Sequence, residues 1–384
     1  MLRKLVRILV LVGAAPLLVA VVACSSGARG SSDLTPGSPA ASQASPAASP
    51  SPPRPTPTPS PLPTATATAS PMPTTAPARS WLLSPMSHAY QTWNNCGPVS
   101  ALMALSYYGV TISQPEAADA LKTHSQDKNV SPEEMVSYLS SFGLEARSLV
   151  DGNLTTLKKL ISAGVPVVLH HRLNLKEDYG HYTVARGYDE AQGVLIINDS
   201  YYGPGRRVAY SEFEQMWDYF NRRYLPVYRP QNRSLVNAIL GPDADEPAML
   251  RRALAASKAR TAATPGNAYA WLNLGETEFL IGDNAAAVAA WEKAQSVGLP
   301  ERIMWYVFWP ATAYNALGKA DVVLALTGEV LAQQPVSPEL LFERGIAYRS
   351  LGDTVRARQA LNQALVYDPG MAKARKALEE LGRG

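Results

Sequence analysis

The chain has 384 residues, a length that predicts two or three folded domains. Its 35 basic and 32 acidic residues give a formal charge of +3, which is too small to indicate a nucleic-acid-binding protein. Only two cysteines are present, at positions 24 and 96, which excludes a small secreted scaffold held by several disulfides. We expect neither a metal nor a cofactor.

Residues 1–23 are predicted to be a lipoprotein signal peptide. Three basic residues precede an apolar run at 8–23, which is too short for a comfortable membrane span. The letters VVAC at 21–24 resemble a bacterial lipobox, in which the cysteine is acylated and becomes the mature N-terminus. This resemblance implies an extracytoplasmic protein that lipid on Cys24 holds at the bacterial cell membrane. The alternative is an ordinary secretory signal.

Residues 24–80 are predicted to form a disordered tether rich in Pro, Ser and Thr. Fourteen of the 31 prolines lie in this segment, which contains no aromatic residue. Such a composition cannot bury enough apolar surface to offset the backbone entropy lost on folding. The tether would hold the next domain away from the membrane.

The composition changes abruptly at Trp81. Residues 81–230 contain aromatic residues, β-branched runs and all five histidines, as expected of a compact domain with helices and strands. The polar stretch at 231–246 is predicted to be a linker or a loosely packed connection. Residues 247–384 are rich in alanine and are predicted to be helical.

The segment 247–384 is predicted to be a repeat array. Proline recurs at intervals of 35, 35 and 34 residues and glycine at intervals of 36 and 34, at Pro265, Pro300, Pro335, Pro369, Gly282, Gly318 and Gly352. The first and last repeats resemble the tetratricopeptide pattern, whereas the middle one is degenerate, with Ala311 in place of the usual glycine. The resemblance implies an all-α solenoid that binds a peptide or protein partner. A spacer and a dimerisation element are the alternatives.

Cys96 is the candidate nucleophile. Apolar residues follow it at helical spacing, at Val99, Leu102, Met103 and Tyr107, and predict a buried helix that has Cys96 at its N-terminus. The dipole and the free N–H groups of a helix N-terminus stabilise a thiolate and lower the pKa of a cysteine. The alternative is a small buried residue without chemistry.

A thiolate nucleophile also needs oxyanion donors and a base. Gln91, five residues before Cys96, is the candidate oxyanion donor through its amide N–H, and the alternative is a surface glutamine in a loop. His181 begins a strand-like run and is the candidate base. His170 and His171 follow another apolar run and are interpreted as groove-lining or core residues.

Asp199 is the candidate partner of His181. A turn near Glu190 predicts a hairpin in which positions 181 and 199 face each other, close enough for the carboxylate to bond the imidazole. A register slip of one residue would present Asn198 instead.

The order Gln-Cys-Gly-Pro, then Gly-His-Tyr, then Asp resembles the bacterial double-glycine cysteine peptidases, and more closely their stand-alone relatives in the papain-like superfamily. The resemblance spans residues 85–228 and implies an α+β papain-like cysteine peptidase domain. It implies a nucleophile, a general base and acid, an orienting group and an oxyanion donor at Cys96, His181, Asp199 and Gln91. Papain-like enzymes also accept Asn as the orienting group.

Together these features predict a lipid-anchored thiol hydrolase of peptide or isopeptide bonds. Two other functions stay open: a catalytically inactive scaffold for protein–protein interaction, and an acyl transferase with the same triad. The complete set of candidate residues favours catalysis over the scaffold. No feature of the sequence separates hydrolysis from transfer. One departure from the family pattern is Ser200, where a Pro often follows the aspartate.

Overall fold

The computed structural model describes residues 79–122 and 124–382. The predicted signal peptide, Cys24 and the tether up to residue 78 lie outside the described residues. Strand β1 (Ser80–Leu82) includes Ser80, so the first domain begins one residue earlier than predicted. Within the described ranges, no helix is both long and apolar enough to cross a membrane.

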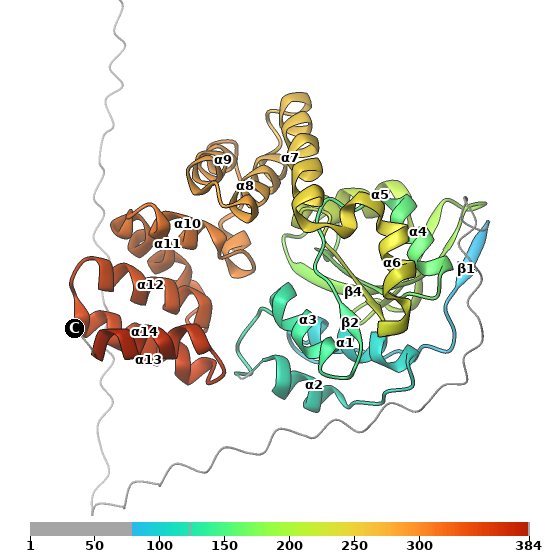
Figure 1. Cartoon of the computed structure of the whole chain (residues 1–384), viewed down its shortest axis with the longest axis horizontal. Coiled ribbons are helices and arrows are strands. Elements are labelled where there is room, and N and C mark those ends of the chain that lie inside the picture. Colours follow the sequence, from blue (N-terminus) through green and yellow to red (C-terminus); the bar gives the residue numbers. More distant parts are fainter. Residues whose placement is uncertain (1–78, 123, 383–384) are drawn as a thin grey trace, which may run out of the picture. The chain divides into compact units, whose positions relative to one another are not determined.

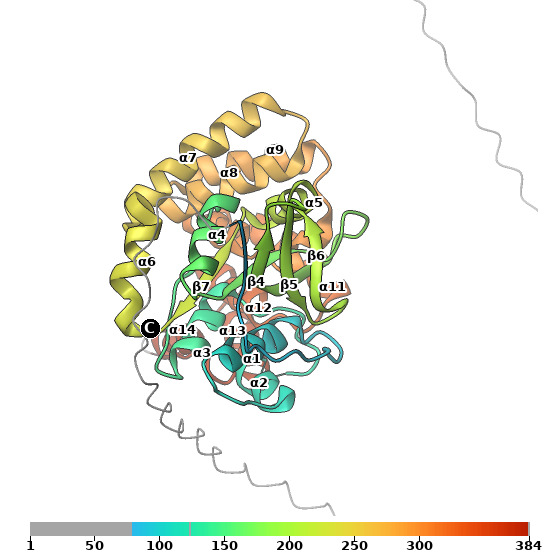
Figure 2. The same cartoon turned by 90° about the vertical axis from the view of Figure 1, so that its right-hand side faces the viewer.

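The first domain is built on one antiparallel sheet, which has seven strands in the described part of the chain (Figure 1, Figure 2). The strand order is β2-β7-β3-β4-β5-β6, and β1 pairs with β4. The remaining strands are β2 (Glu145–Ala146), β3 (Val167–Arg172), β4 (Gly180–Asp189), β5 (Val194–Asp199), β6 (Gly203–Ala209) and β7 (Tyr224–Tyr228). Strand β4 is central, and most of its side chains are buried on both faces.

Helices cover both faces of this sheet, with α1 and α3 on one side and α4 and α5 on the other (Figure 1). The helices are α1 (Cys96–Tyr107), α2 (Gln114–Leu121), α3 (Pro132–Ser140), α4 (Leu154–Ser162) and α5 (Tyr210–Trp217). Helices α2 and α3 begin where Ser113 and Ser131 form capping boxes with the glutamate three residues later. Helix α1 is buried from residue 97 to residue 105, as its apolar sequence requires. The predicted α+β fold is confirmed.

The segment 231–246 is folded, which corrects the predicted linker. It forms α6 (Arg233–Leu240) between two short 3-10 turns, Pro230–Asn232 and Gly241–Ala244. Val236 and Leu240 are buried in the core of the first domain, although the segment as a whole is polar. Val236 and Leu240 are four positions apart and lie on the same face of the helix. This helix was missed because it is short and lies between proline and glycine residues that indicate a loop.

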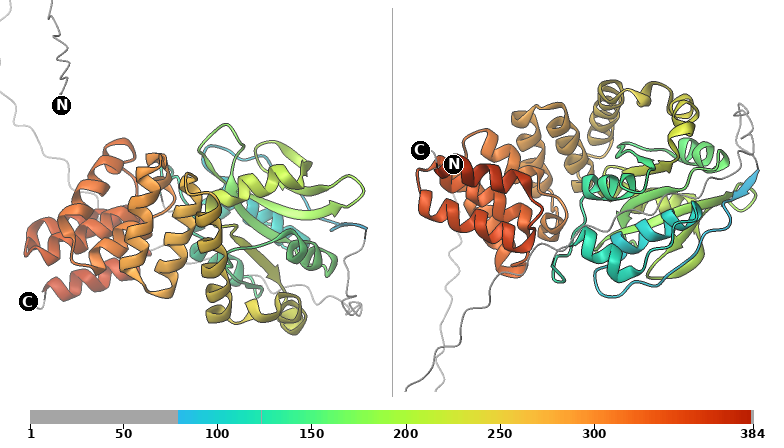
Figure 3. Two further views of the ribbon diagram at one scale, coloured as in Figure 1. Left: turned by 90° about the horizontal axis from the view of Figure 1, so that it is seen from above. Right: turned by 60° about the horizontal axis from the view of Figure 1, so that its bottom comes forward.

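The described residues after this segment form eight α-helices and one 3-10 helix (Figure 3). The α-helices are α7 (Glu246–Ala263), α8 (Ala268–Ile281), α9 (Asn284–Ser296), α10 (Trp309–Ala316), α11 (Ala320–Gln333), α12 (Pro338–Ser350), α13 (Thr354–Tyr367) and α14 (Ala372–Gly382). The pairs α8/α9, α10/α11 and α12/α13 are the three predicted repeats. A Cβ atom on Gly275 of α8 would lie 2.7 Å from Trp309 of α10, so only glycine permits the close approach of α8 and α10. The predicted all-α repeat fold is confirmed.

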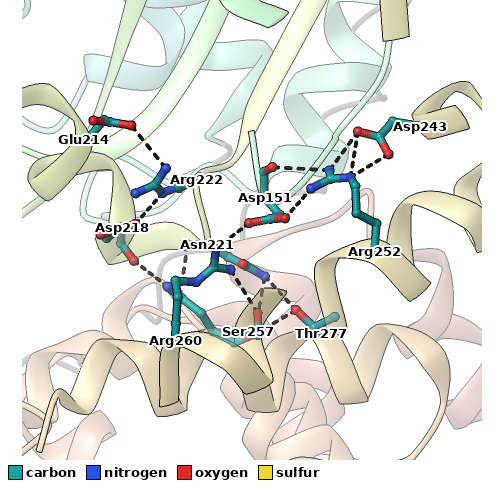
Figure 4. A network of polar contacts seen from close by, with 11 residues as sticks. Asp151, Glu214, Asp218, Asn221, Arg222, Asp243, Arg252, Ser257, Arg260 and Thr277 are labelled. Atoms are coloured by element: carbon teal, nitrogen blue, oxygen red, sulfur yellow. Dashed lines mark hydrogen bonds and ion pairs between the residues drawn. The ribbon is translucent and has the colours of Figure 1, made fainter. Parts of the chain in front are cut away.

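A buried carboxylate joins α7 to the first domain (Figure 4). Asp151 is 5% exposed and forms ion pairs with Arg252 and Arg260 of α7, the second at 2.7 Å. Nearby, the Asn221 side-chain amide donates to Thr277 Oγ1 of α8 at 3.1 Å. Because burial removes water from these groups, each requires the partner that the other part of the chain supplies. The first two repeat-region helices are therefore held to the first domain by polar contacts.

Asp151→Asn should weaken this junction. The substitution keeps the shape of the side chain but removes the charge that two arginines share, so we expect the free energy of unfolding to fall by about 2 kcal/mol. Urea denaturation followed by circular dichroism measures the change. Glu380→Gln is the matched control, because its ion pair with Arg349 is exposed and should contribute less than about 0.5 kcal/mol. Equal losses in the two variants would contradict the importance of Asp151.

Candidate active site

Cys96 is the first residue of α1, as predicted. The turn before it is held by Asn94, whose φ of +57° is left-handed, and by the buried side chain of Lys122. The Lys122 Nζ donates to the Asn94 carbonyl at 2.8 Å and to Asn95 Oδ1 at 3.1 Å. The thiol is free and partly exposed. It therefore lies at a helix N-terminus with an ammonium group nearby, and both features favour the thiolate.

His181 and Asp199 lie in adjacent strands, but the register differs from the predicted one. Strands β4 and β5 pair Val184 with Asn198, with a bulge after Ala185, and the turn lies at 190–193. Because the turn lies further along the chain than predicted, continuing this register places Asp199 diagonally from His181. The two side chains still share one face of the sheet, and His181 Nε2 lies 2.9 Å from Asp199 Oδ1.

The Asp199 carboxylate is fully buried and densely hydrogen-bonded. Its Oδ1 accepts from His181 and from the backbone N–H groups of Tyr201 and Tyr202, at 2.9, 2.9 and 3.1 Å. Its Oδ2 accepts from Arg206 at 3.1 Å, a partner that the sequence did not predict. Burial alone would raise the pKa of this carboxyl, but His181 and the two N–H groups hold the pKa well below its usual range. Asp199 is therefore ionised and fixes the imidazole.

The His181 ring and the Cys96 thiol shift each other's pKa. Since Nε2 is taken by Asp199, Nδ1 is the nitrogen left for the thiol. Burial alone would lower the pKa of His181, but the neighbouring Asp199 and Cys96 raise it to about 9. Burial would raise the pKa of Cys96, but the neighbouring His181 outweighs burial and lowers it. The two shifts favour a thiolate–imidazolium pair.

Gln91 forms two hydrogen bonds with Ser200, the residue that follows Asp199. Its backbone N–H donates to the Ser200 carbonyl at 2.9 Å, and its Oε1 accepts from Ser200 Oγ at 2.7 Å. With the amide oxygen occupied, the amide N–H groups are the remaining donors of this side chain. Ser200, which departs from the family pattern, thus holds the candidate oxyanion donor in place.

The alternative residues are engaged elsewhere. Asn198 Oδ1 accepts from the Gly205 N–H at 3.1 Å, so the amide supports the strand end and does not bond His181. His171 bonds Thr183 Oγ1 at 2.9 Å, and burial lowers its pKa to about 3. Burial also lowers the pKa of His170 well below its usual value. In the described part of the chain, no three His, Cys, Asp or Glu side chains are grouped so as to hold a metal ion.

Tyr306 lies at the same site and was not predicted. It follows the 3-10 helix η4 (Glu301–Trp305) and, with Gly180 and Val130, lines a narrow slot beside Cys96. A Cβ atom on Gly180 would lie 3.0 Å from the Tyr306 ring, so the small residue before His181 permits this contact. No pattern in the sequence could place Tyr306 here, because it belongs to the degenerate repeat and its position depends on how the repeats meet the first domain.

These contacts define a thiol–imidazole–carboxylate site on an α+β fold that is followed by helical repeats. Residues 78–225 match the model of the Peptidase_C39 like family, and residues 338–371 match that of the Tetratricopeptide repeat. The chain therefore contains a Peptidase_C39-like domain and a tetratricopeptide repeat. A search of the curated proteins finds no match.

Several solved structures are similar to parts of this chain. A double glycine motif protease from an AMS/PCAT transporter, in complex with its leader peptide, has 21% identity and a TM-score of 0.31, with 38% of this chain and 93% of that chain covered. The peptidase domain of Streptococcus ComA has 21% identity and a TM-score of 0.30, with 37% and 96% covered. MamA has 21% identity and a TM-score of 0.33, with 36% and 80% covered.

Asp199→Asn should lower the pKa of His181. The variant removes the negative charge that stabilises the imidazolium, so the ring should lose its proton more than one pH unit below about 9. NMR titration of the His181 ring resonances measures this pKa directly. Asp189→Asn is the matched control, because this carboxylate lies on the same strand as His181 but pairs with Arg207 instead. An unchanged His181 titration in Asp199→Asn would contradict the pairing.

Proposed function

We propose that the protein is a cysteine peptidase that hydrolyses peptide or isopeptide bonds through Cys96, His181 and Asp199. The observation that carries the proposal is the hydrogen bond of the His181 imidazole to a fully buried carboxylate, beside a thiol whose pKa the same imidazole lowers. These are the nucleophile, base and orienting group that thiol catalysis needs. The match of residues 78–225 to a peptidase-like family supports the same chemistry.

Before the reaction begins, the proton of the Cys96 thiol has moved to the His181 imidazole. The Cys96 thiolate attacks the substrate carbonyl carbon, and the carbonyl electron pair moves onto the oxygen, where the Cys96 N–H and the Gln91 amide donate to it. When the tetrahedral intermediate collapses, the C–N bond breaks and His181 protonates the leaving amine. His181 then takes a proton from water, which attacks the thioester and releases the acid and the thiolate.

The lowered pKa of Cys96 favours catalysis over an inactive scaffold, because a scaffold has no use for a thiolate. An acyl transferase would share the first half of the reaction and differ in the acceptor of the acyl group. Product analysis separates the two, since hydrolysis yields a free carboxylate and transfer yields a new amide. We further propose that the repeats bind the peptide or protein substrate, which is the common use of such solenoids.

Substitutions of His181 and Gln91 should separate the base from the oxyanion donor. A library of proteome-derived peptides, read by mass spectrometry, supplies a cleaved sequence for kinetics. His181→Ala should abolish turnover and also slow alkylation of Cys96, because the thiolate loses its counterion. Gln91→Ala should lower kcat by about 10²–10³-fold while alkylation stays unchanged, because this amide acts only on the oxyanion.

His124→Ala is the control for these variants, because this histidine lies in a loop where its ring contacts Tyr367. It should cleave the same peptide at the rate of the unmodified chain. Unaltered turnover in His181→Ala would contradict the proposed base. Equal slowing of alkylation in Gln91→Ala would contradict the oxyanion role.

We also propose that lipid on Cys24 holds the peptidase at the outer face of the bacterial cell membrane. The support is the lipobox-like sequence at 21–24 and the proline-rich tether that follows it. Cys24→Ser should move the protein from the membrane fraction to the soluble fraction after cell lysis. Cys96→Ser, which removes the other thiol, should stay in the membrane fraction. Retention of Cys24→Ser at the membrane would contradict the lipid anchor.

A further inference from the structure

A cavity of about 420 Å³ lies between the first domain and the repeats. His170 and Arg223 belong to its wall on the first domain, and Tyr306 and Glu339 belong to its wall on the repeats. His170 and Tyr306 also line the slot beside Cys96, so the cavity adjoins the candidate nucleophile. The cavity and the slot therefore share the His170 and Tyr306 side chains as walls.

The walls of the cavity are acidic. Its lining contains more carboxylates than cations: Glu133, Glu134, Glu276, Glu339, Glu343 and Asp368 against Arg223 and Lys373. Among the described residues, one of these carboxylates forms an ion pair: Glu276 pairs with Arg223 at 3.0 Å. The Lys373 Nζ lies 4.5 Å from the centre of the Phe342 ring. The other five carboxylates of the lining form no ion pair in the described part of the chain.

Glu339 is the carboxylate with the least compensation. Its Oε2 is buried and has no hydrogen-bond partner in the part of the chain that the structure describes. Burial, together with the charges of Asp127 and Glu134, raises the pKa of Glu339 well above its usual range. A cation placed beside this group would stabilise its charged form.

A second unpartnered group lies where the cavity meets the slot. His170 is 3% exposed, and its Nδ1 has no hydrogen-bond partner among the described residues. The ring is held between Tyr182 and Phe220, with centroid distances of 4.2 and 3.7 Å. Buried polar atoms without a partner are rare in folded proteins, and each requires an explanation. A polar group of a bound peptide would supply the missing partner.

We propose that this cavity is a substrate subsite that binds a lysine or arginine side chain of the peptide that Cys96 attacks. The inference rests on the proposed peptidase function. Glu339 and its neighbouring carboxylates would pair with the cationic head, and the aromatic rings of Phe279 and Trp309 in the wall would contact the methylene stem. The repeats would thereby select the substrate directly.

The test compares two fluorescein-labelled peptides, tri-lysine amide and tri-glutamine amide, on the full chain with Cys96→Ala. Fluorescence anisotropy should give a Kd for tri-lysine that is about tenfold lower or better, an advantage that salt should reduce. Glu133→Gln with Glu339→Gln should remove the advantage, because both carboxylates line the cavity. The single Glu133→Gln variant, at an exposed position, repeats the test if the double variant does not fold.

The matched control is Asp119→Asn with Asp321→Asn, which removes two exposed charges outside the cavity. This variant should keep the preference for tri-lysine. Equal affinities for the two peptides, or an equal loss in the control, would overturn the subsite. Spermidine that displaces tri-lysine at a comparable concentration would indicate a site for small polyamines and would also overturn it.

Alkylation of the unmodified chain distinguishes this failure from failure of the proposed function. Iodoacetamide carries no basic side chain, so its rate with Cys96 reports on the thiolate alone. A reactive Cys96 without a tri-lysine preference would leave the peptidase proposal intact and reject the subsite. If iodoacetamide alkylates Cys96 no faster than a free thiol, the peptidase proposal is rejected, whether or not tri-lysine binds.

Discussion

The buried charge of Asp199 is the constraint on which the site depends. A carboxylate without water stays ionised only if donors surround it, and the donors here come from β4, from β6 and from the turn that joins β5 to β6. One of these donors is His181, which is thereby fixed in orientation and held protonated up to about pH 9. The protonated ring in turn lowers the pKa of Cys96. Removal of the Asp199 carboxylate would therefore raise the pKa of the Cys96 thiol, although the two groups do not need to be in contact.

Much of this arrangement could be predicted from the sequence, because it depends on local patterns. The helix after Cys96 follows from apolar spacing, and the meeting of His181 with Asp199 follows from a hairpin, even though the turn and the bulge shift its register. The helix at 233–240 was missed because the proline and glycine residues on either side of this short segment indicate a loop. Arg206 was missed because its contact depends on the irregular register between β5 and β6, and Tyr306 because its position depends on how the repeats meet the first domain.

The repeats are part of the site and not only an appendage. Asp151 and Asn221 hold α7 and α8 through groups that would be unpaired without them. This fixed junction is what allows Tyr306 to contact Gly180 beside the candidate base. The same junction closes the acidic cavity, in which Glu339 Oε2 has no hydrogen-bond partner among the described residues. A first domain joined to the repeats by a loose linker could not form such a cavity, so the folded segment at 233–240 has a structural consequence.

The most direct test of the central claim is the rate of Cys96 alkylation by iodoacetamide as a function of pH, read by mass spectrometry of the peptide that contains Cys96. A thiolate paired with His181 should react nearly as fast at pH 6 as at pH 8, because the thiol has a lowered pKa and the imidazolium persists to about pH 9. Replacement of Asp199 by Asn should abolish this plateau. A rate that rises about tenfold with each pH unit, as for a free thiol, and that Asp199→Asn leaves unchanged would contradict the account.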